Sequence, residues 1–489
     1  MNFLKKLAGE SAIYGLSSVV PRLLNYLLIF LHSRVFLVEE YGVVTEMYAY
    51  LGFLLVFLTF GFETGYFRFS SLPNASHKVY STALFSLVAV NLTFLTAVIL
   101  FSNSIISSLG YPNKPEYAVI LAAIISLDSI AAIPFARLRQ LNRPIVFSTI
   151  KILGVLINVF FNIFFLIICP KVDYLKDAFF YVPNNAITYI FVANLIASIF
   201  TTTIVIYLSR KEEFKFSFSD LKHLLIYSIP LLISGIGGTT NETFDRIFIK
   251  FLVPPEDNPM YQLGIYGSNV KLAVLMVLFI QMYRYAAEPF FFKSAAHKGS
   301  NTIYSITTKY FLAFTLLIFL GVGLFTDIFK FMVGKDFRTG LDVVPILLLA
   351  NVFYGLFFNL SIWYKLTNKT WYGIYFTFIG AAVTITVNLL LTKHIGFYGA
   401  AWGRLLCYVV MCVVCFVVGQ RFLKIPYDIK GILFNIVIAL LIFYIGYTVE
   451  IQNTILSFLF RIILIASYIL FFYLYEMRFG DKQFNFKFR

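Results

Sequence analysis

Long apolar runs alternate with short polar segments along the whole chain of 489 residues. Each run has about 20 residues or more, the length that an α-helix needs to cross a hydrocarbon core about 30 Å thick. Short segments of strictly alternating polarity, which a membrane β-barrel would need, are not seen. The pattern therefore predicts an all-α polytopic membrane protein with about 14 transmembrane helices, near residues 12–36, 41–67, 79–101, 117–136, 145–169, 186–208, 221–251, 263–292, 304–330, 341–364, 371–392, 398–419, 431–449 and 454–476.

One part of this pattern occurs twice. An apolar run that begins at Tyr41-Gly42 ends with Glu63, and a second run that begins at Tyr266-Gly267 ends with Glu288, with the same offset in numbering at each position. Two blocks in almost constant register indicate a duplicated half. Because six spans, an even number, separate the copies, we expect two parallel six-helix repeats that form two lobes around a central cavity. Further matches, in a register shifted by a single position, join Asn142-Arg143 to Asn368-Lys369, Gly154 to Gly380, and Asn162 to Asn388.

The repeat divides the chain into four parts. We expect an N-lobe at residues 1–208 with spans 1–6, a cytoplasmic linker at 209–220, a C-lobe at 221–419 with spans 7–12, and an appendage at 420–489 made of two extra spans and a basic tail. The linker carries a run of charged residues that suits a solvated segment. No loop is long enough to fold as a soluble domain.

Composition supports the same class and explains the charge. The chain is 60% hydrophobic and 13% charged, with a mean hydropathy of +0.83, whereas soluble proteins have roughly a quarter of their residues charged. If the N-terminus is cytoplasmic, the loops on that side contain 23 Lys and Arg residues and the opposite loops contain 9. This positive-inside bias predicts that both termini are cytoplasmic. It accounts for much of the net charge of +15 without a nucleic-acid partner.

Motifs for enzymatic chemistry are missing from the sequence. We find no HExxH, P-loop, GxSxG or paired-carboxylate arrangement, and the five His residues are scattered. Cys412 and Cys415 have CxxC spacing, but they lie in an apolar run and are best explained as small apolar side chains. The sequence therefore predicts no enzyme, no metal and no cofactor, and it does not identify a coupling ion, whether H+ or Na+.

Basic side chains inside the spans are candidates for a substrate site, because a charge near the bilayer centre costs at least about 2.5–3.5 kcal/mol and usually faces protein or a wet cavity. Arg22 is the strongest candidate, since it lies near the middle of the first span with Ser18 and Asn25 on the same helical face. Snorkelling to the interface also explains Arg404, which is nearer a span end. The predicted cavity residues are Arg22, Asn25, Arg246, Lys271 and Arg404.

Acidic side chains inside the spans are candidates for gating or ion coupling. Glu46 and Lys271 are equivalent in the repeat, so their opposite charges could meet across the central axis and close an outer gate. Asp128 lies near mid-span with no partner in the sequence, which suits coupling to an ion or a proton. The predicted gate or coupling residues are Glu46, Asp128, Glu63 and Glu288.

Two acid–base pairs have the spacing to neutralise themselves within one helix. Glu242 and Arg246 are four residues apart, as are Arg284 and Glu288. For the first pair, self-pairing and contact with a ligand are equally well supported. For the second, a structural ion pair is favoured.

Several short motifs give the chain a family resemblance, namely Glu40-Tyr41-Gly42, Ile265-Tyr266-Gly267, Phe244-Asp245-Arg246 and the segment from Gly396 to Gly403. With the arrangement of spans, they resemble the polysaccharide transporter branch of the multidrug/oligosaccharidyl-lipid/polysaccharide flippase superfamily. The resemblance implies a multi-pass protein of the bacterial inner membrane. It would flip an undecaprenyl-pyrophosphate-linked oligosaccharide, the precursor of O-antigen (lipopolysaccharide), capsule or exopolysaccharide, and work beside glycosyltransferases or a glycan polymerase.

The resemblance also implies which residues hold the substrate. In the similar lipid II flippases, bases of the first, second and eighth spans hold the pyrophosphate, and here Arg22 and Lys271 would supply the first and the last. The second span departs from that pattern, since it carries Glu46 and Glu63 and no internal Arg. The two extra spans resemble those that form a groove for the lipid tail.

Two alternatives remain beside a flippase. A drug/cation antiporter of the same superfamily would need an acidic or apolar cavity centred on Asp128, Glu46 or Glu63. A non-transporting scaffold of an envelope-assembly complex would depend on its loops and not on its cavity charges. An integral-membrane glycan enzyme is less well supported, because the external loops are short.

The topology is testable by cysteine labelling. In a Cys-free background, a single Cys introduced in the linker at residues 209–220 should not react with a membrane-impermeant reagent added from outside, because the loop charges predict a cytoplasmic linker. Labelling of intact cells, with permeabilised cells as the positive control, measures this. A linker Cys that reacts in intact cells would contradict the predicted topology.

Overall fold

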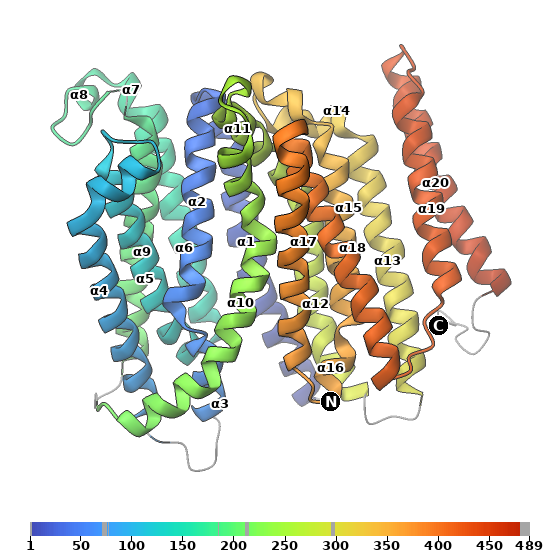
Figure 1. Cartoon of the computed structure of the whole chain (residues 1–489), viewed down its shortest axis with the longest axis horizontal. Helices are drawn as coiled ribbons and strands as arrows, with labels where there is room; N and C mark the ends of the chain where they lie inside the picture. The colour runs from blue at the N-terminus through green and yellow to red at the C-terminus, as the bar shows by residue number, and fades with distance from the viewer. Residues whose placement is uncertain are drawn as a thin grey trace. The chain divides into compact units, whose positions relative to one another are not determined.

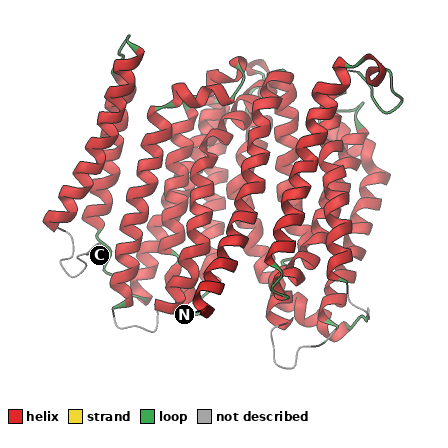
Figure 2. Cartoon of the chain, turned by 180° about the vertical axis from the view of Figure 1, so that it is seen from behind, coloured by secondary structure: helices red, strands yellow, loops and turns green. Residues whose placement is uncertain are grey.

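The computed structural model describes residues 2–70, 76, 78–183, 185–210, 215–294 and 299–479, with the side chains of these residues apart from 2–18, 286, 289, 293 and 479. This described part is helical, and Figure 2 shows no strand in it. The predicted linker and basic tail therefore lie partly outside the described residues.

The helices follow one another along the chain with short connections (Figure 1). The first half contains α1 (Asn2–Val35), α2 (Val38–Thr59), α3 (Phe62–Ser70), α4 (Val79–Ser108), α5 (Pro115–Gln140), α6 (Pro144–Ile163), which a π-helical turn (Phe164–Ile168) continues into α7 (Cys169–Lys171), then α8 (Asp173–Lys176) and α9 (Ala186–Ser209). The second half contains α10 (Phe218–Leu252), α11 (Pro259–Val270), α12 (Val274–Ser294), α13 (Ser300–Leu324), α14 (Thr326–Phe329), α15 (Val343–Leu360), α16 (Ile362–Leu366), α17 (Trp371–Ile395), α18 (Phe397–Phe422), α19 (Ile429–Thr448) and α20 (Thr454–Phe479).

Thirteen helical stretches of the described chain are long and apolar enough to cross a membrane, by length and composition. They coincide with the second to the fourteenth predicted spans. The first predicted span falls on α1, a continuous helix of 34 residues that is not among the thirteen. The prediction of an all-α polytopic membrane fold is confirmed.

Two compact units make up the fold. The first comprises Met1–Ser268 with Thr377–Ala400, and the second comprises Asn269–Phe376 with Ala401–Arg489. In the first unit a buried apolar cluster joins α3, α4, α5 and the first turns of α10, and in the second a cluster joins α12, α13 and α15. The unit boundaries do not follow the predicted lobes, so the division into lobes stays a prediction.

The backbone carries a local sign of the repeat. Asn142 and Asn368, which are equivalent positions of the two copies, both adopt a left-handed conformation, with φ of 51° and 56°. After each of them the next N–H donates back to a carbonyl five residues earlier, from Arg143 to Leu138 (3.0 Å) and from Lys369 to Tyr364 (2.7 Å). This is the left-handed C-terminal cap of a helix, a position that is usually Gly and sometimes Asn. Both copies therefore end a helix in the same way.

Helices α2 and α11, which carry the two Tyr-Gly motifs of the repeat, approach each other closely within the first unit. A Cβ atom added to Gly42 would collide with the carbonyl of Met260, and one added to Gly264 would collide with the carbonyl of Val38. Small residues allow such backbone approach between membrane helices. Glycine is therefore required at both positions, because any side chain would force α2 and α11 apart.

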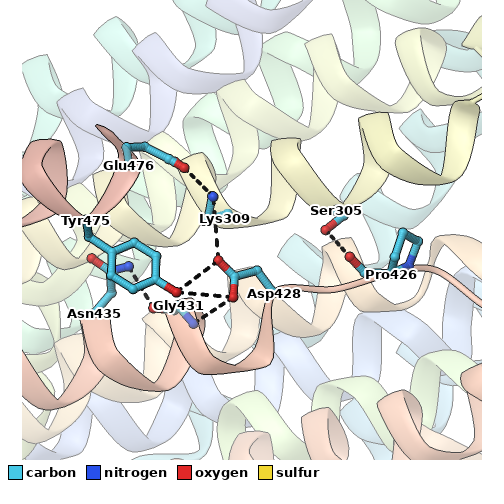
Figure 3. A network of polar contacts seen from close by, with 8 residues as sticks. All are labelled: Ser305, Lys309, Pro426, Asp428, Gly431, Asn435, Tyr475 and Glu476. Carbon is cyan, nitrogen blue, oxygen red and sulfur yellow. Dashed lines mark hydrogen bonds and ion pairs between the residues drawn. The ribbon is translucent and has the colours of Figure 1, made fainter. Parts of the chain in front are cut away.

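A buried polar cluster attaches the two extra spans to α13 in the second unit (Figure 3). Lys309 of α13, whose side chain is 8% exposed, forms an ion pair with Glu476 of α20 and lies 3.6 Å from Asp428. Asp428 also caps α19, since it accepts a hydrogen bond from the N–H of Gly431 (2.9 Å), and the Tyr475 hydroxyl lies 3.3 Å from it. One base thus neutralises acids at both ends of the α19–α20 hairpin.

This cluster predicts a stability difference between two lysines. Replacement of Lys309 by Met should destabilise the protein by about 3–5 kcal/mol, because the largely buried Glu476 carboxylate, 15% exposed, loses its counter-ion. Lys330→Met is the matched control, since Lys330 is 33% exposed and its pair with Asp327 is worth about 1 kcal/mol or less. Thermal unfolding of the purified proteins in detergent measures both. Equal losses would show that the cluster does not hold the hairpin.

Candidate functional site

A ladder of polar side chains runs between α1 and α6 in the first unit. Arg22 and Asn25 are exposed on α1, and Asn25 accepts a hydrogen bond from Asn158 of α6 (3.1 Å). Asn158 accepts one from the Asn162 amide (3.0 Å), and Asn162 Oδ1 lies 2.9 Å from His32 Nε2. An amide in hydrocarbon needs such partners, since water does not supply them. The structure thus brings the predicted Arg22 and Asn25 to a polar face of α1.

A second group of charges lies behind this ladder. Lys151 of α6 lies within electrostatic reach of Arg22 and of Asp128 on α5. Asp128 accepts a hydrogen bond from the Ser198 hydroxyl of α9 (2.9 Å), so three helices meet at this carboxylate. Ser18, predicted beside Arg22, lies outside the described side chains.

Glu46 lies in a closed network that the sequence did not predict. Its side chain is fully buried on α2, and its Oε1 accepts a hydrogen bond from Lys250 Nζ of α10 (2.6 Å). Its Oε2 accepts one from the Tyr111 hydroxyl (2.5 Å), and Lys250 also donates to the Leu109 carbonyl (2.5 Å). Burial, and then the Glu46 carboxylate, raise the pKa of Tyr111, so its hydroxyl keeps the proton it donates. Both oxygens of Glu46 therefore have partners within the first unit, and the pairing of Glu46 with Lys271 stays a prediction.

Two of the motifs behind the family resemblance meet in the first unit. The Tyr266 hydroxyl of α11 donates a hydrogen bond to Asp245 Oδ2 on α10 (2.5 Å), and both side chains are buried. Asp245 Oδ1 accepts from the backbone N–H of Arg246 (2.8 Å). Asp245 is thus a structural acceptor that ties α10 to α11. Arg246 itself is half-buried on α10.

The two acids at the ends of the repeated runs form equivalent ion pairs. Glu63 pairs with Arg139 of α5, and Glu288 pairs with Lys365 of α16 (2.7 Å). Both partners follow the repeat, since Arg139 and Lys365 have the same offset as Asn142 and Asn368. The prediction that Glu288 pairs with Arg284 is wrong, because Arg284 instead donates to a tyrosine hydroxyl on α15 (3.2 Å). Glu288 therefore pairs with a base on a neighbouring helix and not with the base four positions earlier on its own helix.

The two remaining predicted cavity residues belong to the second unit. Lys271 is half-buried on a single 3-10 turn between α11 and α12, and Arg404 is buried on α18. The other predicted cavity residues, Arg22, Asn25 and Arg246, belong to the first unit. A common cavity for all five stays a prediction.

Sequence reasoning missed Lys250 and Tyr111. Lys250, which lies inside α10 between Ile249 and Phe251, was not among the predicted site residues. Its apolar neighbours were the available sign in the sequence that this lysine lies within a helix. Tyr111 lies in the short connection between α4 and α5, and nothing in its sequence context indicates that it reaches Glu46.

Comparison with known proteins agrees with this architecture. The lipid II flippase MurJ, in an inward closed conformation, matches with a TM-score of 0.72 at 16% identity, covering 96% of this chain and 100% of that one. An inward-facing multidrug resistance MATE transporter matches with a TM-score of 0.61 at 13% identity, covering 84% and 94%. A MOP superfamily transporter from Pyrococcus furiosus gives 0.54 at 13% identity, with the same coverage. The chain therefore has the fold shared by MurJ and the MATE transporters.

The sequence itself matches a family model. No curated protein sequence matches the chain. The model described as polysaccharide biosynthesis protein matches residues 7–295, which is more than half of the chain. This match confirms the family resemblance predicted from the motifs. The chain therefore belongs to the polysaccharide biosynthesis protein family, with an all-helical polytopic membrane fold like that of MurJ and the MATE transporters.

Proposed function

We propose that the protein flips an undecaprenyl-pyrophosphate-linked oligosaccharide, a precursor of O-antigen, capsule or exopolysaccharide, across the bacterial inner membrane. The two lobes alternate access to a cavity between them, and both termini are cytoplasmic. Glycosyltransferases supply the substrate and a glycan polymerase or a further transferase consumes it. The observation that carries this proposal is that Arg22, which lies in the first predicted span, is exposed on α1.

A side chain that is exposed at this depth is in contact with either lipid or water. An Arg in contact with hydrocarbon costs at least about 2.5–3.5 kcal/mol, whereas the neighbouring Asn25 and Asn158 amides are the kind of groups that line a wet cavity. A water-filled, basic cavity suits a pyrophosphate and a hydrated glycan. The guanidinium binds phosphate oxygens in a bidentate way, which adds geometric selectivity to charge.

The acids support an anionic substrate over a cationic one. Glu46 is paired with Lys250, and Glu63 is paired with Arg139. Asp128, the third acid on which a cation site could be centred, lies within reach of the Lys151 charge. Each acid that a drug/cation antiporter would use therefore has a protein base beside it.

The Glu46 network supports a gate. Its three side chains come from α2, from α10 of the second repeat, and from the α4–α5 connection. Under the predicted topology this is the external end of the spans. A buried ion pair there stabilises the state in which the external end is closed, and transport requires that it opens.

Arg22 is tested by export of the surface glycan. Arg22→Ala should abolish export at a matched protein level, and Arg22→Lys should retain part of it, because Lys keeps the charge and loses the bidentate geometry. Arg34→Ala on the same helix is the control, since Arg34 donates to the Phe30 carbonyl one turn earlier (2.7 Å). Normal export by the Arg22→Ala strain would show that this residue is structural.

The gate is tested by a double-mutant cycle on Glu46→Gln and Lys250→Met. Lys250→Met alone should cost about 3–5 kcal/mol of stability, because a fully buried carboxylate loses its counter-ion. The double variant should be more stable than the sum of the single losses predicts. Thermal unfolding in detergent measures all four proteins.

The matched control is the same cycle on Glu63 and Arg139, whose side chains are 44% and 34% exposed. Its coupling should stay below about 1 kcal/mol. Strictly additive stability losses for the Glu46 and Lys250 variants would show that the ion pair does not stabilise the closed state.

A further inference from the structure

An apolar groove lies on the first unit, away from Arg22 and from the Glu46 network. It has a volume of about 530 Å³ and is formed by the α2–α3 junction, the first third of α4, the segment before α10 and the first turns of α10. Six of its residues carry the argument: Phe62, Phe85, Val90, Phe216, Leu221 and Leu225. Its polar wall residue, Ser86, donates its hydrogen bond to the Thr82 carbonyl of its own helix (2.8 Å). The groove therefore offers an occupant an apolar surface.

The groove lies at the depth of one leaflet of the membrane. Phe85 and Val90 are six and eleven residues after the start of α4 at Val79, which corresponds to about 9–16 Å along the helix axis. Phe85 is 46% exposed although it lies in a membrane-spanning helix. The opening of the groove thus faces lipid tails. The loop charges predict that this leaflet is the cytoplasmic one.

The first turns of α10 form an amphipathic segment at the rim. Phe218, Leu221, Lys222 and Leu225 are three or four residues apart and lie on one face. Leu224, three residues after Leu221, is buried and packs against α3, and Leu221 and Leu225 pack against the same buried cluster. Figure 1 shows that α10 bends between this segment and its membrane-spanning part, and Pro230 lies inside the helix. This geometry is typical of a helix that lies in the membrane interface.

The charges at the rim are basic. Lys222 lies on the same face as two residues of the groove wall, and Lys78, one residue before α4, is also exposed. The nearby described acid, Asp220, accepts a hydrogen bond from Ser76 (2.7 Å) and belongs to the first turn of α10. A negatively charged head group above the groove would meet Lys222 and Lys78, while its acyl chain fills the apolar space.

We propose that this groove binds a phospholipid with an anionic head group from the leaflet on the side of the linker. Each base near an anionic lipid surface contributes about fivefold to the binding constant. The bound lipid holds the first turns of α10, the helix that follows the connection between the two repeats. The proposal concerns a structural lipid, so it does not depend on which substrate is transported.

Native mass spectrometry of the full chain, solubilised in detergent with a defined lipid added, tests this. The wild-type protein should retain phosphatidylglycerol about fivefold or more over phosphatidylcholine. Lys222→Gln should reduce that preference about fivefold, and Ala89→Trp should reduce retention of both lipids, because Ala89 is an exposed residue of the groove wall. Lys176→Gln, which removes an exposed base on α8, should change neither.

Three results would overturn the proposal. The first is equal retention of the two lipids by the wild type. The second is unchanged retention by both Lys222→Gln and Ala89→Trp, which would indicate ordinary lipid around the protein. The third is displacement of phosphatidylglycerol by an equal concentration of undecaprenyl phosphate in the wild type but not in Ala89→Trp, which would assign the groove to the tail of a transported lipid.

Discussion

A carboxylate enclosed at membrane depth needs partners to stay charged, and Glu46 is such a carboxylate. Its two oxygens are held by Lys250 and Tyr111, so α2, α10 and the α4–α5 connection must meet at one point. Because α2 must also come close to α11, Gly42 and Gly264 are constrained to have no side chain. The same requirement governs Asp245, whose oxygens are held by a hydroxyl and a backbone N–H. The need of buried polar groups for hydrogen-bond and ion-pair partners in hydrocarbon thus determines which helices of the first unit are neighbours.

The repeat is visible in the structure as well as in the sequence. Equivalent Asn residues end helices in a left-handed conformation, and equivalent acids, Glu63 and Glu288, pair with equivalent bases. A cap and an ion pair each require several backbone and side-chain positions to agree. Agreement at both, in a register that shifts by only one position between the two blocks, is therefore stronger support for duplication than isolated sequence matches.

Hydropathy and repetition predicted the helices and the membrane class, because these depend on run length and on periodic matches, whereas the family was predicted from the resemblance of short motifs. They did not predict which charges pair. Helical spacing matched Glu288 with Arg284, yet Glu288 pairs with Lys365, and no pattern in the sequence matched Glu46 with Lys250. Pairing between helices depends on the rotation of each helix about its axis and on its depth. A hydropathy profile contains neither the rotation nor the depth of a helix. The connection that carries Tyr111 has no periodic pattern from which its position could be predicted.

The difference between the acids and Arg22 indicates what the first unit can bind. Its membrane-embedded acids Glu46 and Glu63 are in ion pairs with bases of the protein, and Asp128 is held by a serine hydroxyl beside Lys151. Arg22 has no ion pair among the residues that the structure describes, and the charge of Lys151, which lies within electrostatic reach of it, is of the same sign. An exposed base in a unit whose acids Glu46 and Glu63 are neutralised internally therefore favours the proposed anionic substrate over a cationic one.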